Sequence, residues 1–282
     1  MRFMHSFSTR PLSIDLYGYG ALRRMAGNIW YFSLSLAYLR RLGVETVLHT
    51  DTLGAALLGH LPYDEILLTL DNVPGDIHPR FWAAGKIWAL AAEPAGTINI
   101  DGDVFIKSDK ALCRMESEPW DFLAQHYESS EWYEKENVVF DRDVEYIGSL
   151  GIRPHENGAY NTGIIAFGSQ LLRDRFCHAY KLAAMHYSSV ARDLLDSDNM
   201  LTPDVIIEQR HALQLCRGCG AKVTLMLPRE KELTKQANAI GYQHVVTSRK
   251  FDDLDKCRAA LQKIDTDIYN KTELLCRNIL KK

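Results

Sequence analysis

Two aspartates separated by one glycine, Asp101-Gly102-Asp103, are the residues whose types and spacing most directly suggest chemistry. They follow an apolar run, Thr97 to Ile100, whose isoleucines are typical of a buried strand. A carboxylate beside a buried strand needs a partner, because an unpaired charge removed from water costs several kcal/mol. Since Gly102 has no side chain, the backbone can turn there, and both carboxylates can reach one divalent cation. An ordinary Asp-Gly turn after a strand is the alternative interpretation.

A basic residue precedes this strand. The segment from Phe81 to Ala92 is predicted to be a helix that is apolar on nearly all sides, and Lys86 and Glu93 interrupt its apolar surface. Lys86 could form an ion pair with the two carboxylates, or with an anionic ligand that they help to hold. Extension of the ammonium group into solvent is the alternative.

The elements that must position these groups alternate between strand and helix patterns. Phe3 to Phe7 is a predicted strand, apolar residues from Met25 to Leu39 recur at helical spacing, and Val44 to His49 is a second predicted strand. This order indicates a βαβ unit, so we expect an α/β fold with a mainly parallel sheet. Asp51 follows the second strand, where it could accept hydrogen bonds from a nucleoside or could cap the next helix.

Composition excludes several classes of protein. The chain has 282 residues, of which 46% are hydrophobic and 24% charged, as in an ordinary globular protein. Its net charge of -3 and the absence of a Lys/Arg-rich run argue against a nucleic-acid partner. Since no leader-like or membrane-spanning apolar segment is apparent, we expect a cytoplasmic protein. No repeat or linker divides the chain, which predicts one domain over residues 1–282.

The cysteines give little evidence of a site. Six of them are scattered along the chain, which favours free thiols in a protein without a secretion signal. Cys216 and Cys219 have a spacing seen in zinc and redox sites, but no second pair or nearby His completes four ligands. We therefore interpret them as incidental thiols at a helix end.

The order of these features resembles a known family. A buried helix with one Lys, followed by an apolar strand that ends in Asp-Xaa-Asp, is similar to the nucleotide-binding half of GT-A glycosyltransferases, in particular the branch with glycogenin and the bacterial lipopolysaccharide galactosyltransferases. The resemblance implies a GT-A (Rossmann-like) fold, in which a mixed, mainly parallel sheet is flanked by helices. It implies a nucleotide-binding half over residues 1–110 and an acceptor half over residues 111–282. It also implies that Asp101 and Asp103 hold Mn²⁺ or Mg²⁺ at the phosphates of a nucleotide sugar.

Two further motifs lie in the second half. The segment from Asn157 to Phe167 contains Asn161 and is similar to the family's Asn-Xaa-Gly motif, which enters a strand beside the sugar pocket. A helix capped by Thr202 carries Glu208 and Gln209, which resemble the acidic-Gln pair near the anomeric carbon. The resemblance thus implies catalytic roles for Asn161, Glu208 and Gln209.

The segment from His244 to Lys250 resembles the family's C-terminal His-Xaa-Xaa-Gly-Xaa-Xaa-Lys motif. In the family the His is the third metal ligand and the Lys neutralises the departing diphosphate. Thr247 stands in place of the Gly, and Phe251 and Asp252 stand where the family has Pro-Trp. A hydrogen-bonded structural role is the alternative for His244.

These features predict a metal-dependent glycosyltransferase that moves a sugar from a nucleotide-diphosphate sugar, by resemblance a UDP-sugar, to a hydroxyl group of a glycan or other acceptor. The predicted metal ligands are Asp101, Asp103 and His244. The predicted residues for binding the nucleotide sugar are Thr9, Asp51, Lys86 and Lys250.

Two other functions are compatible with the sequence. In a haloacid-dehalogenase-type phosphatase, Asp101 would be the nucleophile and Asp103 an acid, with Lys250, Asp252 and Asp253 completing the site. That family, however, begins its fold with the carboxylate strand. The second alternative is a non-catalytic GT-A-like subunit that only binds nucleotide or a partner.

The remaining segments are predicted scaffold, with one exception left open. The aromatic residues between Met115 and Ile152 could stack on acceptor sugars or could fill a local core; they are Trp120, Phe122, Tyr127, Trp132, Tyr133 and Phe140. Helical spacing predicts one helix from Ser169 to Leu195 and one C-terminal helix from Leu254 to Ile268.

Overall fold

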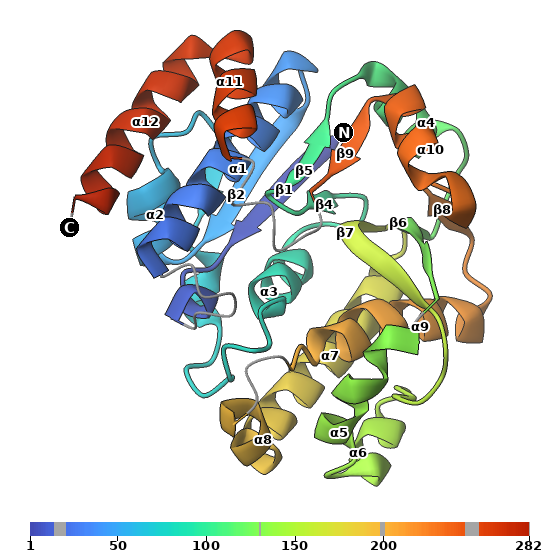
Figure 1. The fold of residues 1–282 in the computed structure, drawn as a ribbon. Helices are drawn as coiled ribbons and strands as arrows, with labels where there is room; N and C mark the ends of the chain where they lie inside the picture. Colours follow the sequence, from blue (N-terminus) through green and yellow to red (C-terminus); the bar gives the residue numbers. More distant parts are fainter. Residues whose placement is uncertain (14–20, 130, 198–200, 246–253, 282) are drawn as a thin grey trace.

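The protein is described by a computed structural model that covers residues 1–13, 21–129, 131–197, 201–245 and 254–281 (Figure 1). Within these ranges, seven strands form the main sheet. Their spatial order is β3 (Glu65–Leu67), β2 (Glu45–Thr50), β1 (Arg2–Phe7), β4 (Ile98–Ile100), β7 (Ala159–Phe167), β6 (Phe122–Glu128) and β8 (Val223–Leu225). β7 is antiparallel to both of its neighbours, and the other pairs are parallel. The predicted fold class, a mixed but mainly parallel Rossmann-like sheet flanked by helices, is confirmed.

Helices cover both faces of this sheet (Figure 1). The longer helices are α1 (Ala21–Arg41), α3 (Ala84–Ala92), α4 (Asp109–Glu116), α7 (Gln170–Val190), α9 (His211–Cys219), α10 (Leu233–Ile240), α11 (Leu254–Ile264) and α12 (Thr266–Leu280). The shorter ones are α2 (Thr52–Leu58), α5 (Asn137–Phe140), α6 (Val144–Ser149) and α8 (Arg192–Ser197), and the helical turns are η1 (Arg10–Ser13), η2 (Thr69–Asn72), η3 (Glu131–Glu136), η4 (Val205–Arg210) and η5 (Glu230–Glu232).

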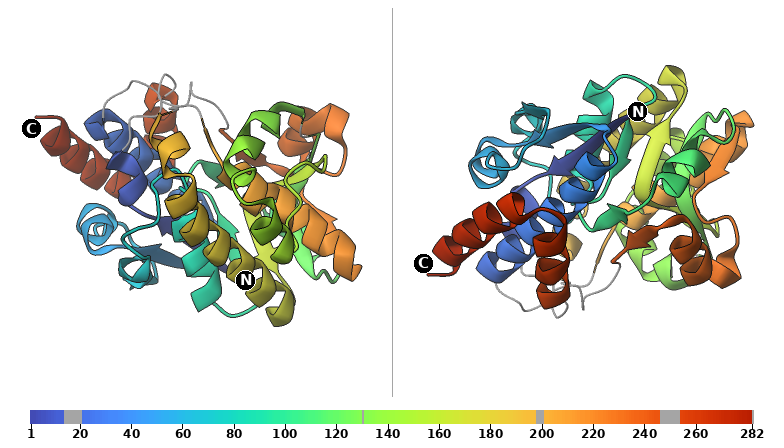
Figure 2. Two further views of the ribbon diagram at one scale, coloured as in Figure 1. Left: turned by 90° about the horizontal axis from the view of Figure 1, so that it is seen from below. Right: turned by 90° about the horizontal axis from the view of Figure 1, so that it is seen from above.

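Each face of the sheet has its own apolar core, because successive side chains of a strand point to opposite faces. On β1, Met4 packs in a cluster with α3, α7 and η4. Phe7 points the other way, into a cluster with α1, α2, α11 and α12. Both views in Figure 2 show the C-terminal helices, coloured red, beside α1, coloured blue. The last two helices of the chain therefore complete the apolar core that covers one face of the first strands.

The βαβ unit predicted at the start of the chain is confirmed as β1, α1 and β2. α1 ends in Arg40 and Arg41, and Gly43 follows with φ of 68°, the left-handed conformation that glycine tolerates best. Since β6, β7 and β8 extend the same sheet as β1 to β4, we keep the proposal that residues 1–282 form one domain, with the halves 1–110 and 111–282.

Several predicted elements differ in their bounds, among them the helix predicted from Phe81 to Ala92, which begins at Ala84. The predicted C-terminal helix is two helices, because Asp265 accepts a hydrogen bond from the backbone N of Ile268 and starts α12. The helix predicted from Ser169 to Leu195 ends at Val190 and is followed by α8. Thr202 does not cap the helix of Glu208: its hydroxyl donates to Glu136, and η4 begins after Asp204.

Three of the six aromatic residues considered between Met115 and Ile152 belong to the core. Phe122, Tyr133 and Phe140 are buried, and they pack with α7 and η4 in the cluster described above. These three side chains are therefore not available to stack on a sugar, which favours the local-core interpretation. The side chain of Trp132 lies outside those that the structure describes.

Two other expectations bear on the class of protein. Cys216 and Cys219 lie at the end of α9 as free thiols, as predicted. In the ranges that the structure covers, no helix has both the length and the apolar character that crossing a bilayer requires.

Candidate functional site

Asp101 and Asp103 lie at the point where the chain leaves the main sheet. β4 ends at Ile100, and the chain turns into β5 (Val104–Ile106), a strand of a separate two-stranded sheet. The backbone N of Asp101 donates to the carbonyl of Gly163 on β7 at 2.9 Å, and the carbonyl of Asp101 accepts from the N of Val104 at 2.9 Å. These bonds anchor the turn on both sides, so the two carboxylates have defined positions.

The sequence suggests that Gly102 is needed for backbone freedom in this turn, but the structure gives a steric reason. The φ of Gly102 is not positive, so the backbone conformation itself does not require glycine. A Cβ atom at this position would lie 2.3 Å from the ring of Phe32 on α1, which is closer than any van der Waals contact. The glycine therefore lets α1 approach the turn that carries the acids.

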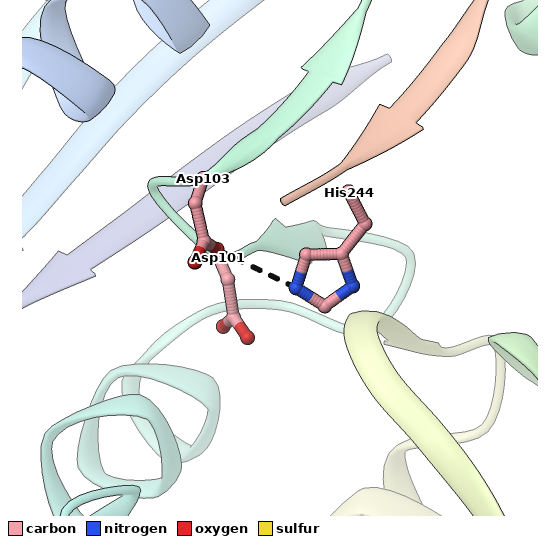
Figure 3. A group of neighbouring side chains, drawn as sticks. All are labelled: Asp101, Asp103 and His244. Atoms are coloured by element: carbon pink, nitrogen blue, oxygen red, sulfur yellow. Dashed lines mark ion pairs between the residues drawn. The ribbon is translucent and has the colours of Figure 1, made fainter. Parts of the chain in front are cut away.

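His244 reaches the acids because its strand pairs with β5. β9 (Tyr242–His244) runs antiparallel to β5 with His244 opposite Val104, and the N of Val245 donates to the carbonyl of Asp103 at 3.0 Å. The ligand atoms of Asp101, Asp103 and His244 all lie within 4.8 Å of one another. Figure 3 shows the imidazole directed toward the acids, with Nε2 at 3.5 Å from Oδ1 of Asp103. Two strands distant in sequence thus bring together all three predicted metal ligands.

The donor set of this cluster fits a divalent ion. It offers two carboxylates, which suit Mn²⁺ and Mg²⁺, and one imidazole nitrogen, which other divalent transition metals also accept. The side chains are 32% exposed for Asp101, 15% for Asp103 and 10% for His244, so the cluster opens to solvent on the side of Asp101. That opening leaves room for further ligands from water or substrate.

Lys86 on α3 is buried against the cluster rather than extended into solvent. Its Nζ lies 2.8 Å from Oδ1 of Asp101 and 2.9 Å from Oε1 of Glu208, and it donates to the carbonyl of Thr162 at 3.1 Å. Burial alone would lower the pKa of Lys86, but the two carboxylates outweigh it and raise that pKa. Asp101, Asp103 and Glu208 together bring three acids to this region, whereas Lys86 brings one ammonium group, and a divalent ion can offset the excess of negative charge.

Glu208 comes from η4, a π-helical turn of the kind often found at functional sites. Oε1 of Glu208 accepts hydrogen bonds from Lys86 and from the hydroxyl of Thr162, the latter at 2.9 Å. Burial raises the pKa of Glu208, while Lys86 opposes this shift. Glu208 is thus joined to Asp101 through a shared lysine.

Asp204, one turn before Glu208, is a second buried acid. It accepts hydrogen bonds from the backbone N of Ala83 and the hydroxyl of Tyr180. Burial, reinforced by the charge of Glu208, raises the pKa of Asp204 from 3.8 to about 8. This carboxyl group therefore stays protonated in the folded protein at pH values where it is ionised in the unfolded chain.

Asp204→Asn should flatten the pH dependence of stability. Below about pH 4 the carboxyl group of Asp204 is protonated in both the folded and the unfolded chain. Between about pH 4 and 8 it is ionised only in the unfolded chain, so its contribution to the free energy of unfolding falls as pH rises. Asparagine mimics the protonated acid and does not titrate. The free energy of unfolding of the variant, relative to that of the wild type, should therefore rise by up to roughly 1 kcal/mol per pH unit in this window. Urea unfolding at about pH 5, 6.5 and 8 measures the difference. Parallel profiles for the two proteins would contradict it.

Asn161 and Gln209 belong to a neighbouring polar cluster centred on Glu128. Oε1 of Glu128 accepts from Nδ2 of Asn161 at 2.7 Å and lies 3.2 Å from Nε2 of His126, while Oε2 accepts from the hydroxyl of Tyr133. That hydroxyl also lies 2.9 Å from Oε1 of Gln209. Burial would raise the pKa of Glu128, but these hydrogen bonds outweigh it and lower that pKa. Glu128 therefore remains an ionised carboxylate.

Asn161 links this cluster to the acids. Its Oδ1 accepts from the N of Gly163 at 3.1 Å, and the carbonyl of Gly163 holds Asp101. Gln125, His126 and Glu128 were not among the residues predicted for the site. Their signal was available, because three polar residues interrupt the otherwise apolar strand from Phe122 to Glu128.

Thr9 and Asp51 lie next to one another at the ends of β1 and β2. Oδ1 of Asp51 caps α2 by accepting from the N of Gly54 at 2.7 Å, so the capping interpretation is correct. Oδ2 accepts from the N of Thr9 at 2.7 Å and from its hydroxyl at 3.0 Å. A role of this pair in binding a nucleoside stays a prediction. Lys250 lies outside the residues that the structure describes, as do Asp252 and Asp253.

Comparisons with known proteins identify a family but no activity. The model of a family of unknown function, DUF6734, matches residues 1–270. No curated protein shows significant similarity to the sequence. Among solved structures, the crystal structure of the galactosyltransferase LgtC with donor and acceptor sugar analogues is similar over 94% of this chain and 96% of that chain, with a TM-score of 0.45 and 10% identity. The function must therefore be inferred from the residues of the site.

Proposed function

Because this chain belongs to DUF6734, a family of unknown function, its activity has to come from its own side chains, and we propose that it is a metal-dependent glycosyltransferase. It would move a sugar from a nucleotide-diphosphate sugar, with UDP-sugars as the first donor class, to a hydroxyl group of an acceptor. The observation that carries this proposal is the convergence of Asp101, Asp103 and His244 within 4.8 Å. Carboxylate and imidazole groups that converge at the carboxyl end of a strand in a mainly parallel sheet suit a metal ion that coordinates a diphosphate.

In this proposal, Asp101, Asp103 and His244 hold Mn²⁺ or Mg²⁺. The bound ion would supply positive charge to the diphosphate as the bond between sugar and phosphate breaks. Lys86 holds Asp101 and Glu208 in fixed positions and contributes a second positive charge in a buried setting, where charge has its largest effect. The function thus rests on electrostatic stabilisation of the leaving group.

The neighbouring cluster supplies groups that suit sugar hydroxyls. Glu128 is an ionised acceptor, and Asn161 and Gln209 carry amide groups that can donate and accept. Their attachment to the metal ligands through Gly163 would place a sugar close to the diphosphate. We therefore propose that Asn161, Glu208 and Gln209 lie beside the transferred sugar, and that Thr9, Asp51 and Lys250 contact the nucleotide.

The phosphatase alternative has less support. It gives His244 no role, whereas the imidazole lies directly beside the acids. A non-catalytic subunit would bind a nucleotide sugar at the metal ligands without cleaving it, so binding and cleavage must be measured separately.

A screen of nucleotide sugars with and without Mn²⁺ tests the proposal. A donor at about 100 times its Kd adds about 2.7 kcal/mol to stability, which should raise Tm by several degrees only when Mn²⁺ is also present. Release of the nucleoside diphosphate should follow with the same metal requirement. Binding without release would favour the non-catalytic subunit. If no nucleotide sugar binds or is cleaved, and a generic aryl phosphate is hydrolysed, the chain is a phosphatase instead.

A further inference from the structure

Gln125 is a buried side chain that contacts a proposed metal ligand without reaching the metal position itself. Its Oε1 lies 2.7 Å from Nδ1 of His244 and accepts from the hydroxyl of Tyr242 at 2.6 Å. The two contacts come from β9, whereas Gln125 belongs to β6 in the main sheet. The amide therefore joins the two sheets at the one ligand that comes from the C-terminal part of the chain.

The position of Gln125 coincides with a break in the strand register. On β6, Ala124 pairs with Ile165 of β7, but His126 pairs with Asn161, so Gln125 alone faces the stretch from 162 to 164. Such irregularities turn a side chain away from the regular alternation of the ladder. The carbonyl of Gln125 is held by the N of Leu227 at 2.8 Å. The backbone is thus anchored while the side chain is directed to β9.

The surrounding atoms leave the imidazole little freedom. A Cβ atom on Gly163 would lie 2.4 Å from Cε1 and 2.6 Å from Nδ1 of His244, and 2.9 Å from Oε1 of Gln125. Ring and amide are therefore both packed against the backbone of β7. A rotation of the ring that exchanged its two nitrogens would have to break this packing.

The distances decide which ring nitrogen carries the proton. An amide oxygen only accepts, so Nδ1 must donate to Gln125 at 2.7 Å, a normal hydrogen-bond length. On the other side, Nε2 lies 3.5 Å from Oδ1 of Asp103, too far for a good hydrogen bond. If the proton were on Nε2 instead, His244 would lose the hydrogen bond to Gln125 and gain only the longer contact with Asp103. Neutral His244 should thus keep its proton on Nδ1 and turn the lone pair of Nε2 toward the acids.

We propose that Gln125, held by Tyr242, is a positioning residue that fixes the tautomer and orientation of His244 so that Nε2 is ready to bind a metal. The tautomer follows from the contacts alone, while its use in metal binding rests on the proposed function. Hydrogen bonds to the second nitrogen of a ligating histidine set ring orientation and basicity, and their loss typically weakens metal affinity about 10- to 100-fold.

Nitrogen NMR of the metal-free full-length chain tests the tautomer directly. At about pH 8.5, ¹⁵N-labelled histidine should show Nδ1 of His244 protonated and Nε2 unprotonated. The signal is assigned by its loss in His244→Gln. Gln125→Met, which keeps the length but not the acceptor, should abolish the preference for Nδ1, whereas Gln125→Glu, which keeps an acceptor oxygen, should retain it. A wild-type ring protonated on Nε2 would overturn the proposal.

Calorimetric titration with Mn²⁺ tests the consequence for binding. Gln125→Met should bind about 10- to 100-fold more weakly, and Gln125→Glu should bind at least as tightly as the wild type. Gln214→Met is the matched control, because the amide of Gln214 is also hydrogen-bonded, to the backbone of Arg153 and to Glu156 near the surface, and its loss should leave Mn²⁺ affinity unchanged. Unchanged affinity and tautomer in Gln125→Met would overturn the proposal. A wild-type chain with the stated tautomer but no Mn²⁺ binding would instead refute the proposed function and leave the tautomer assignment standing.

Discussion

Asp103→Asn should abolish both donor turnover and the Mn²⁺-dependent rise in Tm. The substitution keeps the size of the side chain but removes one of the two negative charges that face the metal position. Loss of a group that stabilises charge in the transition state typically costs about 100- to 1,000-fold in rate, and we expect at least that loss in nucleoside diphosphate release. The measurements are turnover of the best donor from the screen and thermal unfolding with and without Mn²⁺.

Asp109→Asn on α4 is the matched control for this variant. Asp109 is an exposed acid whose side chain accepts a hydrogen bond from the neighbouring Ser108, and it lies outside the cluster. It should keep wild-type turnover and the wild-type Tm shift. Normal sugar transfer by Asp103→Asn would show that the acids do not hold the catalytic metal.

Gly163→Ala should weaken Mn²⁺ binding although it changes no ligand. The new Cβ would lie 2.4 Å from Cε1 of His244. The backbone of Gly163 cannot easily retreat, because its N donates to Asn161 and its carbonyl accepts from Asp101. The imidazole must therefore move away from the acids, which we expect to reduce Mn²⁺ affinity about 10- to 100-fold. Overpacking of this kind should also cost about 1–3 kcal/mol of stability in urea unfolding.

Gly148→Ala provides the corresponding control. Gly148 lies in α6, and a Cβ atom there would meet nothing within 4 Å. The same chemical change should leave Mn²⁺ affinity unaltered and should stabilise the protein by about 0.4–1 kcal/mol, because alanine restricts the unfolded chain. If Gly163→Ala binds Mn²⁺ as tightly as Gly148→Ala, His244 is not a ligand.

The parts of the fold that the sequence predicts well are those set by local periodicity. β1, α1, β2 and α3 were each recognisable from their own apolar residues, and Arg40, Arg41 and Gly43 indicated where α1 ends. Periodicity failed at the C-terminus. The apolar spacing continues from Ile264 to Ile268 across the break, and only the cap at Asp265 separates α11 from α12.

The site was predictable where motifs carried it and not where it depends on partners from other strands. The acids and His244 were found through the order of their motifs along the chain. For Lys86, an ion pair with the acids and extension into solvent were both left open, because its burial and its pairing with Glu208 depend on how α3 and η4 pack. Gln125 could not be predicted to reach His244, because that contact needs both a register break in β6 and the separate pairing of β5 with β9.

The pairing of β5 with β9 also determines when the cluster can be assembled during protein synthesis. Both acids leave the ribosome with the first half of the chain, but the imidazole beside them is translated much later and joins them only after β9 docks. A polypeptide that ends before β9 carries the two carboxylates but lacks the imidazole that completes the cluster. Capture of a metal, and any donor cleavage that depends on it, would therefore be restricted to polypeptides translated past this strand.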